Sequence, residues 1–314
     1  MIALRQLTKR YGDRLAVDDL TVDIAPGRVT GFLGPNGAGK STTMRMIMGL
    51  DHPTAGTATI GGLEYHRFRH PLREVGALLD AKALHPGRSA RNHLLAMARS
   101  NGIPARRVDE VLGIVGLSEV ARQRAGAYSL GMGQRLGIAG ALLGDPGTLI
   151  FDEPVNGLDP DGVRWVRGLA RSLAGEGRTV FVSSHLMSEM QLTADHLVVI
   201  GRGRLITDAP IVEVLSGSSP ATVRIRVPDT DERSDLAGRL RVAGFPAEPV
   251  PPDGLLVRGA TLSQVGDLAH AAGARLHELA SADPSLEEAY MRLTGDSVEY
   301  RVPTQRHPAP EEAG

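Results

Sequence analysis

The segment from Gly34 to Thr42 constrains this chain more than any other part of its 314 residues. It reads Gly34-Pro35-Asn36-Gly37-Ala38-Gly39-Lys40-Ser41-Thr42 and fits the pattern G-x-x-x-x-G-K-[ST]. An apolar stretch that ends at Leu33 precedes it, and an apolar pattern of helical period follows it. In such a strand-loop-helix context, backbone N–H groups converge on phosphate oxygens, and glycines permit the close approach. The loop therefore predicts a bound nucleoside triphosphate.

Two side chains of this loop have predicted roles of their own. Lys40 is expected to bridge the β- and γ-phosphates, and the Ser41 hydroxyl to ligate Mg²⁺. The helix that begins here adds a favourable dipole for the anion. The alternative is a glycine-rich turn that carries a lysine by chance. Only three lysines occur in the chain, at positions 9, 40 and 82, which argues against chance.

Two carboxylates follow a second apolar stretch, Leu149-Ile150-Phe151. Ligands of an open α/β sheet lie beyond the carboxyl ends of its strands, so Asp152 and Glu153 are expected to face the phosphate loop. Asp152 is predicted to hold Mg²⁺, and Glu153 to polarise the attacking water. An isolated pair of this kind is often only a solvated strand end. Together with the phosphate loop, it favours hydrolysis.

Composition excludes several other classes of protein. The formal net charge of -1 gives no broad basic surface for a nucleic acid, so nucleic-acid partners are not expected. Cysteine is absent, which excludes disulfides, thiol nucleophiles and thiolate metal sites. No uncharged apolar run approaches the roughly 20 residues of a membrane-spanning helix. Any role at a membrane must therefore depend on a partner.

Residues 1–215 are predicted to form an α/β unit of the P-loop type. Short apolar runs at 29–33, 148–151, 179–182 and 197–200 alternate with helical patterns, which is typical of a parallel sheet covered by helices. Between about 86 and 143 the strand signal disappears, and helices are predicted at 91–100, 108–115 and 134–143. This stretch is interpreted as a helical insert.

A loop at 216–220, rich in Ser and Gly, is predicted to separate a second unit. Residues 220–302 are expected to form a small α+β domain, with strands at 223–227 and 255–257. Its expected helices are 235–243, 262–272 and a last one with capping-box spacing between Ser285 and Glu288. The tail 303–314, with three prolines, is predicted to be disordered.

Three further segments make the interpretation specific. Tyr128-Ser129-Leu130-Gly131-Met132, followed by Gln134-Arg135, resembles the signature segment of ABC ATPases, usually written L-S-G-G-Q. Asn156-Gly157-Leu158-Asp159 resembles the D-loop of that family, and Ser184-His185 resembles its switch histidine. Tyr11 stands where these proteins stack an aromatic ring on adenine; packing at a strand end is the alternative.

The resemblance covers roughly residues 1–210 and implies how the active site is completed. In the family, two subunits close head to tail over two ATP molecules. Ser129 and Gly131 would then act in trans on the γ-phosphate of the partner, and Asp159 would lie in the D-loop at the interface. His185 would contact the γ-phosphate of its own subunit. The expected cofactors are ATP and Mg²⁺, and the first expected partner is a second copy of the chain.

The sequence departs from the family pattern at three positions. Leu130 replaces the first glycine of the signature, and Met132 replaces its glutamine. Asp80 stands where the family usually has a glutamine that senses the γ-phosphate and Mg²⁺. An aspartate can ligate Mg²⁺ itself, so Asp80 is a candidate metal ligand. A surface loop carboxylate is the alternative.

The resemblance further implies a peripheral protein on the cytoplasmic face of the membrane, bound to a separate permease. The segments after Asp80 and near Ser285 resemble the antibiotic- and drug-exporter branch, which predicts export of a drug, antibiotic or lipid-like compound. The alternative is a soluble ABC ATPase that acts on nucleic acid or ribosomes. A GTPase or small-molecule kinase is disfavoured because no Asn-Lys-x-Asp segment exists. The identity of the transported compound is not encoded here.

Overall fold

A computed structural model of the chain describes residues 1–80, 83–216, 222–281 and 285–294. The predicted tail 303–314 and most of the predicted boundary loop 216–220 lie outside these residues. No helix within the described ranges is long and apolar enough to span a membrane.

The centre of the structure is a six-stranded sheet with the order β5-β6-β7-β3-β8-β9. Its strands are β5 (Val75–Leu78), β6 (Thr148–Asp152), β7 (Thr179–Ser183), β3 (Arg28–Leu33), β8 (His196–Gly201) and β9 (Arg204–Pro210). All neighbours pair in parallel except β8 and β9, which form an antiparallel edge. The α/β class and the four apolar strands predicted from the sequence are confirmed.

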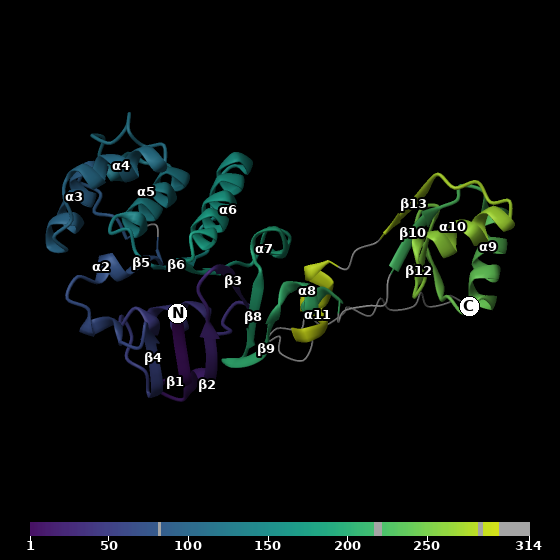
Figure 1. Ribbon diagram of the computed structural model, residues 1–314, viewed down its shortest axis with the longest axis horizontal. Coiled ribbons are helices and arrows are strands. Elements are labelled where there is room, and N and C mark those ends of the chain that lie inside the picture. The colour runs from purple at the N-terminus through teal and green to yellow at the C-terminus, as the bar shows by residue number, and fades with distance from the viewer. Residues whose placement is uncertain (81–82, 217–221, 282–284, 295–314) are drawn as a thin grey trace, which may run out of the picture.

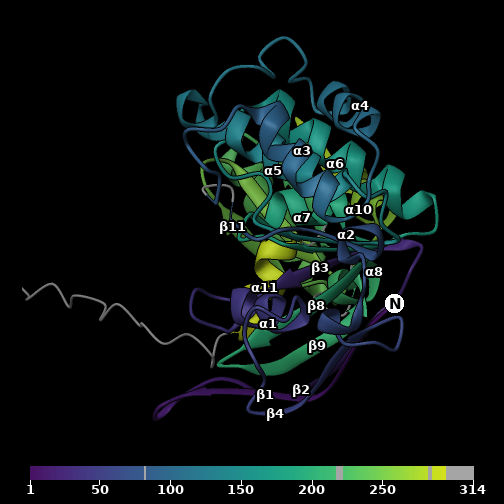
Figure 2. The same ribbon diagram turned by 90° about the vertical axis from the view of Figure 1, so that its left-hand side faces the viewer.

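A second, antiparallel sheet has the order β2-β1-β4, with strands β1 (Ile2–Tyr11), β2 (Arg14–Ile24) and β4 (Ala55–Ile60). The helix α1 (Lys40–Ile47) lies between the two sheets (Figure 2). Its Met44 is fully buried with Phe32 of β3 and Phe181 of β7. The two phenylalanine rings have centroids 4.9 Å apart. This core fixes the direction from which α1 meets the phosphate loop.

Helices cover the other face of the central sheet. The helices in contact with the sheet include α5 (Leu130–Leu142), α6 (Pro160–Gly175), α7 (Met187–Thr193) and α8 (Ile211–Ser216), while α3 (Ala90–Ser100) and α4 (Arg106–Ile114) pack on α5. The helices α3, α4 and α5 gather in one group (Figure 1) and occupy the stretch predicted as a helical insert. The helix α5 begins at Leu130 rather than at Gln134, because the Ser129 side chain accepts a hydrogen bond from the N–H of Met132 and caps it.

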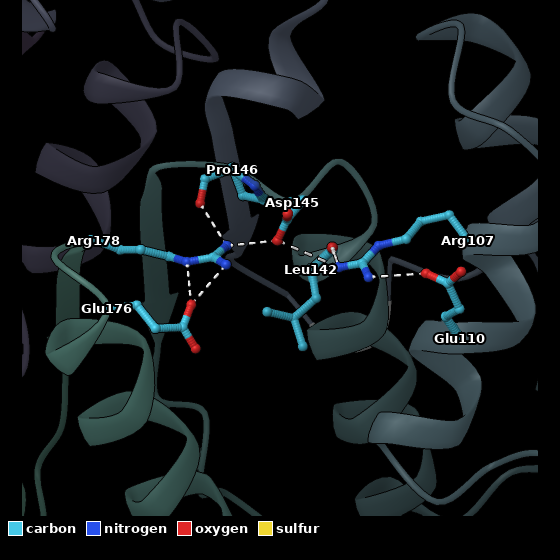
Figure 3. A network of polar contacts seen from close by, with 7 residues as sticks. All are labelled: Arg107, Glu110, Leu142, Asp145, Pro146, Glu176 and Arg178. Atoms are coloured by element: carbon cyan, nitrogen blue, oxygen red, sulfur yellow. Dashed lines mark hydrogen bonds and ion pairs between the residues drawn. The ribbon is translucent and has the colours of Figure 1, made fainter.

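A chain of ion pairs links α4 to the turns before β6 and β7 (Figure 3). The Asp145 carboxylate lies 3.5 Å from Arg107 of α4 and 2.8 Å from Arg178. Arg107 also pairs with Glu110, and Arg178 with Glu176. Because the two arginines are mostly buried and share one carboxylate, the network holds the base of α4 against the central sheet.

The second unit has the order β11-β12-β10-β13 in one antiparallel sheet. Its elements are β10 (Thr222–Arg226), α9 (Thr230–Val242), β11 (Ala247–Val250), β12 (Gly254–Arg258), α10 (Leu262–Ala271) and β13 (Glu278–Ser281). This βαββαβ succession with its strand order is the ferredoxin-like arrangement. The helix α9 begins earlier than the predicted residue 235, because Asp229 accepts two backbone hydrogen bonds and caps it.

The last described helix, α11 (Leu286–Thr294), differs from its expected grouping. The sequence pattern placed it in the second unit, 220–302. Its buried Leu286, Ala289 and Tyr290 instead join the hydrophobic cluster of the first unit, where α11 packs on α7 and α8. The Gln191 side chain of α7 accepts a hydrogen bond of 2.8 Å from the N–H of Leu286. The helix itself is where the capping-box spacing predicted it, but that spacing does not indicate which element the helix packs on. The domain bounds themselves stay a prediction.

Candidate functional site

The phosphate loop connects β3 to α1 through two left-handed glycines. Gly37 has φ 83° and Gly39 has φ 106°, a region that residues with a Cβ rarely adopt. A Cβ on Gly39 would lie 2.5 Å from the carbonyl oxygen of Ala16, and a Cβ on Gly34 would lie 2.5 Å from that of Ile200. The glycines are therefore required by backbone conformation and by space together, as the motif predicted.

The loop lines a pocket of about 520 Å³ at the end of the central sheet. Its walls are the loop itself, the two carboxylates at the end of β6 and the hairpin of β1 and β2: Tyr11, Arg14, Ala16, Pro35, Asn36, Gly37, Ala38, Gly39, Lys40, Ser41, Thr42, Asp152 and Glu153. The structure thus brings the phosphate loop and the acidic pair together at one pocket, as the sequence predicted.

Lys40 is the buried cation of this pocket, with 8% of its surface exposed. Its Nζ donates a hydrogen bond of 2.6 Å to the carbonyl oxygen of Gly34. Burial lowers the pKa of Lys40 below its ordinary value, while the charges of Glu153 and Asp152 act in the opposite direction. A desolvated ammonium held in this way offers an anion a strong electrostatic partner.

One hydroxyl of β7 holds the Asp152 carboxylate and the Glu153 backbone. The Oγ of Ser183 accepts a hydrogen bond of 2.9 Å from the N–H of Glu153 and donates one to Oδ1 of Asp152. Glu153 has φ 51°, so its backbone is in the left-handed region although it is not a glycine. Such strain costs about 1–3 kcal/mol and persists only where the surroundings impose it. The Glu153 side chain contacts His185 from this strained backbone.

His185 lies directly against Glu153. Its Nδ1 is 2.7 Å from Oε2 of Glu153, and its backbone N–H donates to the same oxygen over 3.3 Å. The imidazole is half exposed, with 52% of the side chain accessible. A carboxylate that is held by a histidine and faces a phosphate pocket is suited to orient a water molecule.

The signature segment turns an exposed serine outward at the start of α5. Ser129 is exposed, and its Oγ is occupied as the helix cap. Among the residues that the structure describes, neither Ser129 nor Gly131 lines the pocket of the phosphate loop. Ser129 lines a separate hollow of about 510 Å³ with Pro86, Tyr128 and Leu130.

Leu130, where the signature of the family has a glycine, contacts the D-loop of its own subunit. A Cβ on Gly157 would lie 2.2 Å from Cδ2 of Leu130, so the leucine occupies the space above that glycine. Asp159 caps α6 by accepting a hydrogen bond of 2.9 Å from the N–H of Gly162. The leucine therefore packs the signature turn against the D-loop.

Comparison with known proteins assigns the family. The sequence model described as "ABC transporter" matches residues 17–156, which contain the phosphate loop and the acidic pair. The Nod factor export ATP-binding protein I of Burkholderia lata is 34% identical over 321 residues, which cover 95% of this chain and 98% of that protein. The chain belongs to the ABC transporter ATP-binding proteins. The chain is therefore an ATPase, which binds ATP and hydrolyses it.

Other comparisons agree with this assignment. The bacitracin transport ATP-binding protein BcrA of Bacillus licheniformis is 44% identical over 213 residues, 67% of this chain and 70% of that protein. A dimeric ATP-binding cassette, MJ0796 bound to ADP and Pi, shares the fold of this ABC protein with a TM-score of 0.62 and 23% identity, over 67% of this chain and 99% of that chain. Residues 221–287 match a domain of unknown function.

For two predicted site residues of this ABC protein, Tyr11 and Asp80, the structure supports the predicted role less directly. Tyr11 lines the phosphate pocket and is 46% exposed, with its hydroxyl bonded to Asp51 over 3.0 Å. Asp80 follows β5 and lines a different hollow, of about 400 Å³, between the central sheet and the helical insert. The structure therefore does not bring Asp80 into the pocket of Ser41 and Asp152. Its role as a metal ligand stays a prediction from the sequence.

Sequence reasoning gave no role to several residues of the site. Arg14 lines the pocket beside Tyr11, and Ser183 holds the Asp152 carboxylate and the Glu153 backbone N–H. Gln134 donates to the backbone of Glu153 from the signature helix. Ser183 could have been noticed because it ends the strand before Ser184-His185. The contacts of Arg14 and Gln134 depend on tertiary structure and left no local signal.

Replacement of Gly39 by alanine is expected to destabilise this ABC protein by at least about 1–2 kcal/mol, the backbone cost of a left-handed residue. The close contact with the Ala16 carbonyl adds to this cost. Gly168→Ala is the matched control, because a Cβ added to this helical glycine of α6 would meet nothing within 4 Å. The control should gain about 0.5–1 kcal/mol. Urea unfolding measures both variants, and equal stability of the two would contradict the predicted strain.

Proposed function

We propose that this chain is the ATP-hydrolysing subunit of an exporter, and that it drives a separate membrane permease for a drug, antibiotic or lipid-like compound. The observation that carries the proposal is the convergence of a buried lysine and two carboxylates on one phosphate-loop pocket, with a histidine in contact with one of the carboxylates. The names of its relatives support the direction, because one is a bacitracin transport protein and another a Nod factor export protein.

In this proposal, the main residues of the site have separate roles in binding and hydrolysis. The N–H groups of the loop from Gly34 to Thr42 and the Lys40 ammonium bind the phosphates. Tyr11 contacts the adenine, and Arg14 lies on the same wall. Glu153 accepts a proton from the attacking water, and His185 holds the Glu153 carboxylate in the orientation that this step requires.

Mg²⁺ is the metal that the donor set of the pocket fits. Ser41 offers an exposed hydroxyl at the first turn of α1, and Asp152 offers a carboxylate across the pocket. Both are hard oxygen donors, which Mg²⁺ prefers together with phosphate oxygens and water. Bound there, the ion would neutralise the charge that develops on the phosphates.

The proposal includes a head-to-tail homodimer. Ser129 and Gly131 lie outside the pocket of their own subunit, and Ser129 is exposed at the positive end of α5. That arrangement suits a γ-phosphate carried by a second copy. Asp159 at the start of α6 would lie near the same interface. MJ0796, a protein of the same fold, is dimeric with ADP and Pi.

The permease is proposed to dock on the helical insert. The hollow that contains Asp80 lies between the insert and the central sheet, and it is lined mainly by apolar residues. A helix of a membrane partner placed there would contact both the helical insert and the central sheet. It would therefore respond to a change in their relative position. The protein would then lie at the cytoplasmic face of the membrane through this partner alone.

The dimer provides the test of this proposal. A Glu153→Gln chain is expected to sediment as a dimer with ATP and Mg²⁺ and as a monomer without ATP. Adding Ser129→Asp should abolish the dimer, because aspartate still caps α5 but repels the phosphates of the partner. Ser89→Asp is the control, since Ser89 caps α3 in the same way. The proposal fails if the chain stays monomeric with ATP beside its co-expressed permease, or if it sediments with ribosomes or DNA instead.

A further inference from the structure

Gln134 is a buried glutamine of the signature helix whose polar contact crosses between two parts of the ATPase unit. It is 4% exposed, and its Nε2 donates a hydrogen bond of 3.0 Å to the backbone carbonyl oxygen of Glu153. The bond joins α5 to the residue after β6. These two elements belong to the helical insert and to the central sheet, so the contact ties one to the other.

The orientation of the Gln134 amide follows from chemistry. A carbonyl oxygen can only accept a hydrogen bond, so it must face the amide nitrogen and not the amide oxygen. The Oε1 of Gln134 is buried with no hydrogen-bond partner among the described residues. A buried unpaired acceptor costs about 1–3 kcal/mol. An apolar side chain of the same length would avoid that cost, so packing alone does not explain a glutamine here.

The partner of Gln134 is the strained residue of the active site. Glu153 has φ 51°, and both polar groups of its backbone are held by side chains. Ser183 of β7 accepts from its N–H over 2.9 Å, and Gln134 of α5 donates to its carbonyl over 3.0 Å. Together with the N–H of Asn156, which donates to the same carbonyl oxygen over 3.2 Å, these two bonds fix the peptide planes on either side of the Glu153 Cα, and the Cα geometry sets the direction of the carboxylate.

We infer that Gln134 is a positioning residue for hydrolysis, which holds the backbone of Glu153 so that its carboxylate points at the water site. The inference rests on the proposed role of Glu153 as the base. It adds a link between subunits, because Ser129 caps the same rigid helix that carries Gln134. An α5 helix seated on the ATP of the partner would therefore align the base of its own subunit.

The first test measures steady-state ATP hydrolysis by full-length Gln134→Met. Methionine keeps the length and volume of the side chain but has no N–H donor. We expect kcat to fall roughly 10- to 100-fold, since small displacements of a catalytic group have effects of this size. The KM for ATP should stay within about twofold, because Gln134 does not line the nucleotide pocket. Parental kcat in this variant would overturn the inference.

A second variant guards against a folding defect. Gln134→Asn keeps the amide but shortens its reach, so it should lower kcat in the same way while the protein stays folded. Gln191→Met is the matched control, because that glutamine also makes a side-chain to backbone bond between helices, with Leu286 and away from Glu153. The control should keep the parental kcat. Loss of kcat in the control equal to that in Gln134→Met would also overturn the inference.

A double-mutant cycle separates positioning from general damage. If Gln134 acts through Glu153, adding Gln134→Met to a Glu153→Gln chain should not lower the residual single-turnover rate further. An additional loss as large as in the parent would mean that Gln134 acts elsewhere, and would refute the inference. Failure of the proposed function looks different, because Glu153→Gln would then hydrolyse ATP at the parental rate.

Discussion

A chain that carries Glu153→Gln should bind ATP with parental affinity and hydrolyse it roughly 10²- to 10⁴-fold more slowly, the usual contribution of a general base. Glutamine has the shape of glutamate and can still form a hydrogen bond with His185, but it cannot accept a proton. The backbone bonds of residue 153 to Ser183 and Gln134 do not involve the side chain and should persist. The measurement is phosphate release at saturating ATP, with affinity from nucleotide titration.

The matched control for this prediction is Glu119→Gln. Glu119 is an exposed residue of the helical insert and does not line the pocket, so the same change of charge should leave hydrolysis at the parental rate. Hydrolysis by Glu153→Gln at the parental rate would remove Glu153 from the mechanism. Loss of ATP binding in that variant would instead assign it a role in affinity.

Replacement of Lys40 by methionine should abolish the stabilisation that ATP gives to the fold. In the parent, a ligand at 100 times its Kd stabilises the folded state by about 2.7 kcal/mol. The variant lacks the buried ammonium that faces the phosphates, and a charge-assisted hydrogen bond contributes about 1.5–3 kcal/mol. The melting temperature with and without ATP measures both states, and we expect almost no shift in the variant.

The protein without nucleotide should not lose stability from the same change. Burial lowers the pKa of Lys40, so the folded state disfavours the charged form that the unfolded chain carries at neutral pH. Methionine removes that unfavourable charge, and the melting temperature without ATP should stay equal or rise. A large drop would show that the ammonium mainly supports the fold through its bond to Gly34. A full ATP-induced shift in the variant would contradict the assigned role in binding.

The phosphate loop and the acidic pair could be predicted from the sequence, because the conformation and residue types that they require depend only on neighbouring residues. A left-handed backbone at Gly37 and Gly39 and a carboxylate after a buried strand can be expected from neighbouring residues alone. The pairing of Glu153 with His185 was not predicted from the sequence, because it depends on strand order: β6 and β7 are parallel neighbours whose ends meet. Parallel strands bring their carboxyl ends to one edge, so residues far apart in sequence become neighbours there.

The rest could not be predicted, because it depends on which surfaces meet. Gln134 lies next to the signature in sequence, but its proposed role depends on a hydrogen bond to the backbone of Glu153. Leu130 looked like a loss of the family glycine, and the structure shows its side chain packed over Gly157. The capping-box spacing of α11 was visible in the sequence, but nothing in the sequence indicated that the helix packs on α7 and α8.

Because α11 packs on α8, the ferredoxin-like unit is an insertion between two helices of the ATPase unit. The chain leaves the ATPase core after α8, forms the sheet of β10 to β13, and re-enters at a helix that touches α8 itself. The helices before and after the ferredoxin-like unit, α8 and α11, contact each other. The unit between them can therefore be lengthened, exchanged or removed without changing the path of the ATPase backbone. Evolution can therefore insert different accessory domains into one ATPase domain at the same place, between α8 and α11.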